Sequence, residues 1–277
     1  MIDYLGFMQG RLSPPVNGQI QSFPWDHWKS EFPIAHKLGI NIMEWTLDHD
    51  RLLDNPLLTS DGQRDIKSLS NLYNITIPSL TGDCFMQAPF WKNPDLGSNQ
   101  LKQEFLQVCR ACASVGIQII VVPLVDNSRI ENNQQEAELV EFFLAHLNFF
   151  KSHNLRIVFE CDHSPTQLRK FINYFPSETF GVNYDIGNSA SLGFSPREEF
   201  QEYGKRIVHV HVKDRLLGGT TVPLGTGNAD FDLVFDLLHN IGYSGYLIMQ
   251  TARANNGDHS GVLARYKSLI QVWNKTF

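Results

Sequence analysis

The sequence predicts one (β/α)₈ barrel, and three observations support this fold class. Strand-like and helix-like segments alternate from end to end in eight pairs, as expected for a parallel sheet covered by helices. Four strand-like runs end in a potential metal ligand, at Glu160, Asp185, His211 and Gln250. A barrel of this type takes about 250 residues, and no linker rich in Pro, Gly or Ser divides the chain. We therefore expect residues 1–277 to form a single domain.

The predicted elements follow one another in regular order along the chain. Runs rich in β-branched and aromatic residues predict the strands, at residues 5–9, 41–46, 75–80, 118–122, 156–160, 180–185, 206–211 and 246–250. The helices are expected at residues 25–38, 61–73, 101–115, 136–152, 165–174, 197–203, 230–240 and 259–273. Ser164-Pro165 is a helix start signal and Gly39 a stop signal. The irregular stretch 81–98 after the third strand is expected to form a loop insertion, as a wall or lid over a site.

Composition limits the classes of partner. The formal net charge is −6, so the chain lacks the basic surface that nucleic acid binding requires. The longest apolar run, residues 117–125, is far shorter than the roughly 20 residues of a membrane-spanning helix. The chain begins without a signal-like segment, and we expect a cytoplasmic protein with neither nucleic acid nor membrane partners. A homodimer is compatible with the sequence, because the irregular stretch could contact a partner subunit.

Alternation along the seventh strand places two histidines on one face. In the run IVHVHVKD, the valines share one face, while His209, His211 and Lys213 share the other. The valines suit packing against the outer helices. The histidines and the lysine are therefore expected to point into the barrel or its mouth.

Three further polar side chains end neighbouring strands and are expected on the same inner face. Buried carboxylates such as Glu160 and Asp185 are costly without a cation or hydrogen-bond donors. For His211 alone, the alternative is a hydrogen-bonded interior histidine. Two carboxylates, an imidazole and the amide oxygen of Gln250 together suit one divalent metal ion, with Mn²⁺ preferred and Mg²⁺, Co²⁺ or Zn²⁺ also suitable.

These motifs resemble a known family, the xylose isomerase-like TIM barrels. The resemblance spans nearly the whole chain and is carried by FE at Glu160, YDIGN at Asp185, HVHVKD at His211, PLGTGNADF at residues 223–231 and the last strand ending in Gln250. The family includes sugar and sugar-phosphate isomerases and epimerases, inosose dehydratases and endonuclease IV. The resemblance implies that Glu160, Asp185 and His211 bind one divalent ion, and that Glu160 also moves a proton.

The chain departs from this family pattern at two positions. Gln250 stands where the isomerases usually have a second catalytic glutamate, and an amide can bind metal but cannot act as a general base. Asn188 stands where a histidine is frequent, and we expect it to bond a substrate hydroxyl. His209 and Lys213 are candidate replacements for proton transfer. The alternative for Lys213 is an ion pair with Asp214.

Other residues are candidates for substrate contacts. Glu44 should point inward, where it could bind a hydroxyl or act as a base, and its alternative is an ion pair with Arg11. Arg253 could meet a phosphate or carboxylate, or lie in a surface loop. Trp91 is a candidate wall for the apolar face of a sugar ring.

A glycine-containing loop is a further candidate. Gly225-x-Gly227 precedes the seventh helix, a place where barrels often bind phosphate through backbone N–H groups.

The sequence supports three functional hypotheses. The leading one is a divalent-metal-dependent isomerase or epimerase of a small sugar, sugar phosphate or related polyhydroxy carbonyl compound. The second is an inosose-type dehydratase, which needs only one proton abstraction before loss of hydroxide. The third, from a different class, is a sugar-binding barrel without turnover, with Gln250 as the cause.

Overall fold

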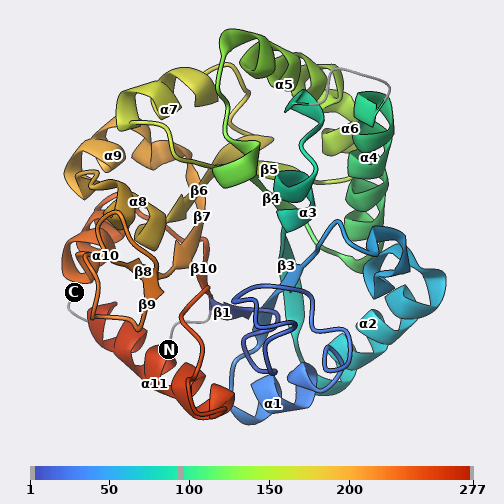
Figure 1. Ribbon diagram of the computed structural model, residues 1–277, viewed down its shortest axis with the longest axis vertical. Helices are drawn as coiled ribbons and strands as arrows, with labels where there is room; N and C mark the ends of the chain where they lie inside the picture. Colours follow the sequence, from blue (N-terminus) through green and yellow to red (C-terminus); the bar gives the residue numbers. More distant parts are fainter. Residues whose placement is uncertain (1–3, 93–96, 275–277) are drawn as a thin grey trace.

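The computed structural model describes residues 4–92 and 97–274 and contains a closed barrel of eight parallel strands inside a ring of helices (Figure 1). Around the barrel the strands follow chain order, and β10 closes it by pairing with β1. The barrel strands are β1 (Leu5–Met8), β2 (Ile42–Thr46), β3 (Thr76–Thr81), β4 (Ile119–Leu124), β5 (Arg156–Cys161), β6 (Phe180–Asp185), β7 (Ile207–Val212) and β10 (Tyr246–Met249). The predicted fold class is confirmed.

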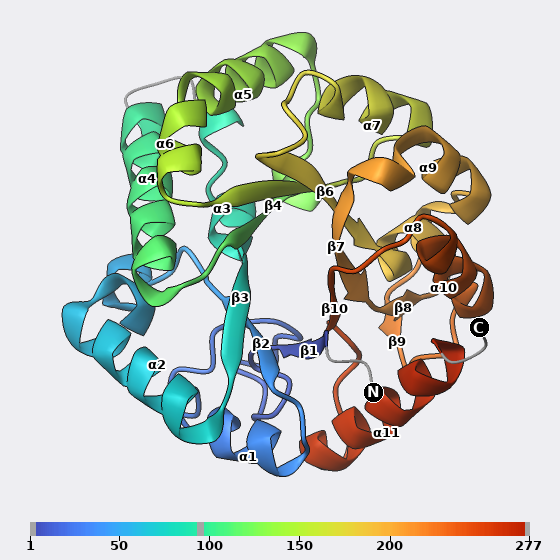
Figure 2. The same cartoon turned by 180° about the vertical axis from the view of Figure 1, so that it is seen from behind.

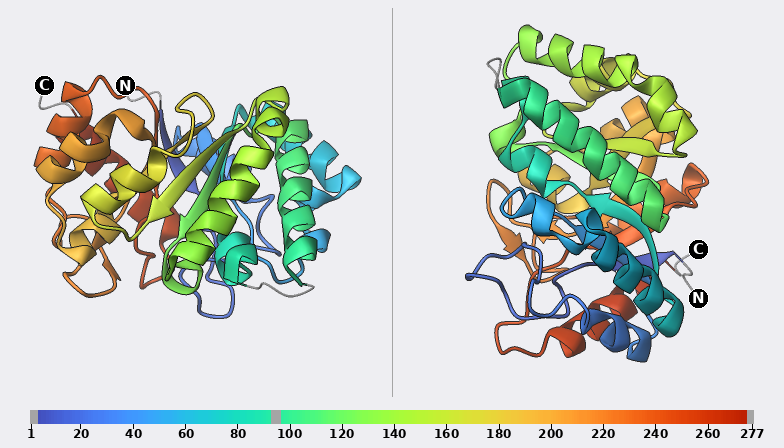
Figure 3. Two further views of the ribbon diagram at one scale, coloured as in Figure 1. Left: turned by 90° about the horizontal axis from the view of Figure 1, so that it is seen from above. Right: turned by 90° about the vertical axis from the view of Figure 1, so that its right-hand side faces the viewer.

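The helices surround the strands on all sides (Figures 2 and 3). They are α1 (Glu31–Lys37), α2 (Ser60–Tyr73), α3 (Asp83–Gln87), α4 (Gly97–Val115), α5 (Asn133–Ala145), α6 (Leu147–Ser152), α7 (Pro165–Ile172), α8 (Ile186–Leu192), α9 (Pro196–Tyr203), α10 (Phe231–Asn240) and α11 (His259–Trp273). A small antiparallel hairpin of β8 (Asp214–Arg215) and β9 (Thr221–Val222) follows β7. In the described ranges, no helix has the length and apolar character that crossing a bilayer would require.

Several predicted helix boundaries were wrong. The first helix begins at Glu31, because the preceding residues form turns in which the N–H groups of His27 and Trp28 bond the Pro24 carbonyl. The single helix expected at 136–152 is two helices, since the backbone of His146 leaves helical geometry. Helix α8 and the β8–β9 hairpin were not expected, because segments this short carry little periodic signal.

The stretch 81–98, expected to be an irregular insertion, is partly helical. It contains α3 and a 3₁₀ turn at Phe90–Lys92, and α4 begins at Gly97. Residues 93–96 of this stretch lie outside the described residues.

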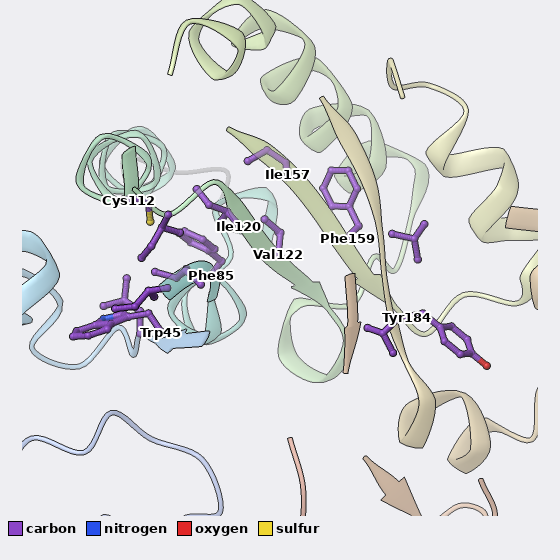
Figure 4. Packing of buried hydrophobic residues seen from close by; sticks show 14 of the residues in the cluster. Trp45, Phe85, Cys112, Ile120, Val122, Ile157, Phe159 and Tyr184 are labelled. Carbon is purple, nitrogen blue, oxygen red and sulfur yellow. The ribbon is translucent and has the colours of Figure 1, made fainter. Parts of the chain in front are cut away.

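The apolar outer faces of the strands pack against the helices (Figure 4). Phe159 of β5 is fully buried and contacts the rings of Phe143 from α5 and Phe171 from α7. Val210 and Val212 of β7 belong to the same core. The predicted alternation is therefore confirmed in these strands, and their other faces are left for polar side chains.

The loop after β1 is held down by one buried carboxylate. Glu31 accepts hydrogen bonds from the backbone N–H groups of Gly10 and Leu12 and from the hydroxyl of Ser13. Gly10 has a φ of +90°, a conformation that L side chains rarely adopt. This anchoring brings Gln21, farther along the loop, to the mouth of the barrel, where it reaches α3 and the end of β10.

Candidate metal centre

A histidine and two carboxylates meet at the ends of neighbouring strands. The Nδ1 atom of His211 lies 3.2 Å from Oε2 of Glu160 and 3.9 Å from Oδ2 of Asp185. One ligand atom from each residue lies within 4.8 Å of the other two, and all three residues are buried. The structure thus brings together three of the four residues that the sequence proposed as metal ligands, and the fourth, Gln250, lies on the other side of Lys213.

The other ring nitrogen of His211 faces Glu44. Its Nε2 lies 2.8 Å from Oε1 of Glu44, which is fully buried within the barrel. An ionised carboxylate only accepts hydrogen bonds, so Nε2 of His211 carries the proton and Nδ1 is the nitrogen that can bind a metal. A carboxylate in this position orients a metal-binding histidine and raises its basicity.

His209 lies one layer deeper than His211. Its Nδ1 lies 2.8 Å from the side-chain oxygen of Asn183, and its Nε2 lies 3.1 Å from both Glu44 and Ser79. Asn183 in turn donates from Nδ2 to Oε2 of Glu160 at 2.7 Å. His209 therefore connects with Glu160 through Asn183.

A lysine ammonium lies between Asp185 and Gln250. Nζ of Lys213 is 2.7 Å from Oδ2 of Asp185 and donates to Oε1 of Gln250 at 2.8 Å. The expected alternative, an ion pair with Asp214, is wrong: Asp214 accepts hydrogen bonds from the backbone of residues 225–229. Lys213 thus marks a place where positive charge is favourable.

The donor set fits a divalent cation. Oδ2 of Asp185 is buried and accepts no hydrogen bond, although it has the Lys213 ammonium beside it. Two carboxylates and an imidazole nitrogen are ligands that Mn²⁺, Mg²⁺, Co²⁺ and Zn²⁺ accept. A second group of Glu44, His209 and His211 also lies within metal-binding distance. It shares His211 with the first group and lies beneath the pocket, so we assign its carboxylate to orienting His211.

The surroundings shift the pKa values of Glu160 and Asp185 in opposite directions. Burial disfavours the charge on Glu160, but His211, Lys213 and Asn183 outweigh burial and lower its pKa. Burial raises the pKa of Asp185, with Lys213 opposing. Burial also disfavours the charged form of His211, but Glu44 and Glu160 outweigh it and raise the pKa of His211 to about 10.

A pocket of about 670 Å³ opens above this cluster. Glu160, Asn188, Lys213 and Gln250 line one part of it, and Asp83 lines another. Nδ2 of Asn188 donates to Oε1 of Glu160 at 2.6 Å. The pocket is large enough for a small carbohydrate, and Glu160 borders it directly.

The structure places other predicted substrate residues away from the pocket. Trp91 is buried and donates from its indole N–H to the carbonyl of Ser128. Arg253 donates to the carbonyls of Ser13 and Ile20, so it holds the loop after β1. In the described part of the chain, no aromatic residue lines this pocket.

Two other expected contacts are replaced. Glu44 does point inward, but its expected alternative partner, Arg11, instead donates to the carbonyls of Ile20 and Thr251 and to Gln21. The backbone N–H groups of Gly225 and Gly227 both donate to Asp214, so they are not free to bind a phosphate. A Cβ at Gly227 would lie 2.2 Å from the Asp214 carboxylate, which explains the glycine.

Four residues of the site were missed in the sequence. Asn183 shares a strand face with Asp185, so alternation could have indicated it. Gln21, Asp83 and Arg215 lie in the loop after β1, at the start of α3 and in the β8–β9 hairpin. Arg215 donates to Oδ1 of Asn188 at 2.8 Å. No periodic pattern identifies these three positions.

The fold and this cluster define a TIM barrel with a candidate metal site at the carboxyl ends of its strands. The sequence profile of the xylose isomerase-like TIM barrel family matches residues 32–273, and the chain belongs to this family.

One relative is similar in sequence, and two solved structures are similar in fold. L-ribulose-5-phosphate 3-epimerase UlaE of Escherichia coli O1:K1 / APEC is 25% identical over 256 residues, covering 88% of this chain and 89% of the relative. The fold resembles D-allulose 3-epimerase from Methylomonas sp., solved with D-allulose, at 14% identity and a TM-score of 0.75, with 97% of each chain covered. It also resembles the IOLI protein, solved with a bound zinc atom, at 17% identity and a TM-score of 0.75, with 99% of each chain covered.

Proposed function

We propose that this protein is a divalent-metal-dependent epimerase or isomerase of a small sugar, sugar phosphate or related polyhydroxy carbonyl compound. The observation that carries the proposal is that Glu160 belongs to the metal-binding group and also lines the pocket. The names of the relatives, which are sugar epimerases, support the same reaction class.

Glu160 is the proposed base of the reaction. Its pKa is held low, so it is ionised at neutral pH and can remove a proton from the carbon next to a carbonyl. Asn188 and Asn183 donate to its two oxygens and fix its direction. Glu160 would then return the proton, or release it to solvent.

The remaining side chains divide into metal ligands and substrate contacts. Glu160, Asp185 and His211 would hold the ion, with Gln250 adding its amide oxygen if Lys213 moves away from it. When bound, the ion would polarise the substrate carbonyl and make the neighbouring C–H more acidic. Mn²⁺ is our first choice.

Lys213, Asn188 and Arg215 line the pocket, and their donors can orient substrate oxygens. His209 has no face on the pocket, and we propose that it positions Asn183. Contacts of substrate with Arg253, Trp91 or Glu44 stay predictions that would require these side chains to leave their present partners.

A metal titration is the first test. Chelator-stripped protein would be titrated with Mn²⁺ by calorimetry, alongside Glu160→Ala, His211→Ala and the control Asp126→Asn, which lines the same pocket. We expect about one site per chain, lost in the first two variants and kept in the control. If the folded wild-type protein does not bind Mn²⁺, the proposal of a metal-dependent enzyme is refuted.

Turnover in D₂O then separates the reactions. The Mn²⁺-loaded protein would be incubated with D-allulose, D-fructose, L-ribulose 5-phosphate and an inosose, with products read by NMR. Deuterium at a sugar carbon without loss of water indicates an epimerase or isomerase. Loss of water indicates the dehydratase, which remains the second candidate because Glu160 alone could start it. Sugar binding without conversion indicates the binding barrel.

Location and assembly are part of the proposal. We propose a cytoplasmic enzyme that acts on a small carbohydrate and has neither nucleic acid nor membrane partners. Light scattering would measure whether it forms a homodimer. The formal net charge of −6 argues against a nucleic acid partner.

A further inference from the structure

Three carboxylate side chains of the described residues line the pocket, and two of them have no role in the cluster above. They are Asp83, Asp126 and Glu160. Asp126 is exposed, whereas Asp83 is only 6% exposed and begins α3, separated from the end of β3 by one residue. Glu160 comes from the end of β5, with β4 between the two strands. Two buried carboxylates therefore line the pocket, one at the start of α3 and one at the end of β5.

We propose that Asp83 is the second proton-transfer group of this pocket, acting on the side of the substrate carbon that Glu160 does not serve. The inference rests on the proposed epimerase function and deepens it. In one direction the Glu160 carboxylate removes the proton and the C–H electron pair becomes part of an enediolate. The neutral Asp83 carboxyl then donates its proton to the same carbon, re-forming the C–H bond with inverted configuration. Exchange with water returns both carboxyl groups to their starting states.

A directed chain of hydrogen bonds links Asp83 to the cluster. Lys213 donates to Oε1 of Gln250, and Nε2 of Gln250 donates to Oε1 of Gln21 at 2.9 Å. Nε2 of Gln21 donates to Oδ2 of Asp83. This hydrogen-bond chain thus ends on a carboxylate oxygen. Each of its two side-chain amides both donates and accepts a hydrogen bond.

The same chain explains why an amide suits position 250. Oε1 of Gln21 also accepts from Arg11 at 3.2 Å, so the amide group of Gln21 is held with its oxygen away from Asp83. A carboxylate at position 250 has no hydrogen to donate, so its oxygen would face Oε1 of Gln21, which is also an acceptor. The amide of Gln250 therefore fits a hydrogen-bond chain that ends at the carboxylate of Asp83. In this protein the second acid–base group would lie after β3 instead of at the end of β10.

The charge environment of Asp83 agrees with this role. Burial raises the pKa of Asp83 to about 7, with Gln21 opposing and the charges of Asp48 and Glu160 adding to the increase. Both protonation states are then populated near neutral pH, whereas Glu160 stays ionised. Two carboxyl groups whose pKa values are pushed apart in one pocket are a common arrangement for an acid and a base.

The test is Asp83→Asn, which keeps the shape of the side chain and an oxygen for Gln21. The probes are D-allulose with D-fructose, and L-ribulose 5-phosphate with its 3-epimer, in D₂O with saturating Mn²⁺. For the pair that the wild-type protein interconverts, epimer formation should fall at least about 100-fold in the variant. Exchange of the C–H proton with solvent should stay within about threefold for one epimer, the one that Glu160 deprotonates, and be lost for the other.

This asymmetry distinguishes proton transfer from a structural role. Mn²⁺ affinity should be unchanged in Asp83→Asn. The control Asp61→Asn, an exposed carboxylate on α2 that does not line the pocket, should convert both epimers normally. Epimer formation within threefold of wild type, or equal loss of exchange from both epimers, would overturn the inference and leave Glu160 as the base. Failure of the wild-type protein to exchange any probe would instead overturn the proposed function, and this inference with it.

Discussion

Replacement of Glu44 tests the orientation of the metal-binding histidine. Glu44 is fully buried, and its two oxygens lie 2.8 Å from Nε2 of His211 and 3.1 Å from Nε2 of His209. In Glu44→Gln the amide oxygen can still accept from His211, while the amide nitrogen can donate to His209. The ring orientation is kept and only the negative charge is lost. Glu44→Ala removes both the charge and the hydrogen bonds.

The expected size of the effect follows from these two losses. Partners of this kind contribute about 10- to 100-fold to metal affinity. We expect Glu44→Gln to weaken Mn²⁺ binding by about tenfold, near the lower limit, because the orientation is preserved. Glu44→Ala should reach about 100-fold and also destabilise the fold by about 2 kcal/mol, because the buried N–H of His211 loses its acceptor.

Calorimetry with Mn²⁺ measures both affinities, and urea unfolding measures stability. The matched control is Glu31→Gln, another fully buried glutamate, which lies at the start of α1 and does not contact the metal-binding group. It should bind Mn²⁺ as the wild type does. Wild-type affinity in both Glu44 variants would refute the view that His211 binds the ion through Nδ1 under the control of Glu44.

Three further predictions concern charge and stability. Lys213→Met should raise Mn²⁺ affinity at least about tenfold in calorimetry, because the ammonium beside Asp185 repels a second cation; unchanged or weaker binding would contradict this. Glu31→Ala should lower the free energy of unfolding by at least about 3 kcal/mol in urea, because three buried donors lose their acceptor; a loss below 1 kcal/mol would argue against the anchor. Folding raises the pKa of Asp83 from 3.8 to about 7, so its stabilising contribution is complete below pH 4 and is lost as the pH rises through 7. Between pH 5 and 8 the wild type should lose about 2 kcal/mol relative to Asp83→Asn, and parallel stability curves would disprove the shift.

Alternation along strands accounts for most of what the sequence could predict. Side chains two residues apart share a face, so the inward direction of His209, His211 and the carboxylates followed from β7 and its neighbours. The same rule could have excluded the pair of Lys213 with Asp214, since adjacent residues point to opposite faces. Lys213 instead contacts Asp185, which is 28 residues away in sequence and one strand away in space.

Long-range contacts between irregular segments could not be predicted in this way. Gln21 and Asp83 are 62 residues apart, in a loop and at a short helix start, where no repeating pattern indicates a direction. Their contact depends on the anchoring of the β1 loop by Glu31, which is itself a tertiary interaction. The burial of Trp91 could not be predicted either, because an aromatic beside a site carries no sequence signal that distinguishes a pocket wall from core packing.

The amide at Gln250 also changes the charge of the metal-loaded site. With a divalent ion, neutral His211, ionised Glu160 and Asp185, and the Lys213 ammonium, the pocket side of the cluster would carry one net positive charge, while the ionised Glu44 lies beneath His211. A carboxylate at position 250 would cancel that charge. The amide therefore weakens the hold on the ion but leaves a positive site facing the pocket, where negative charge develops on the substrate oxygen as Glu160 removes a proton. On this reasoning the amide at Gln250 removes a base from the end of β10 but stabilises the enediolate more strongly than a carboxylate would. The second proton then comes from Asp83.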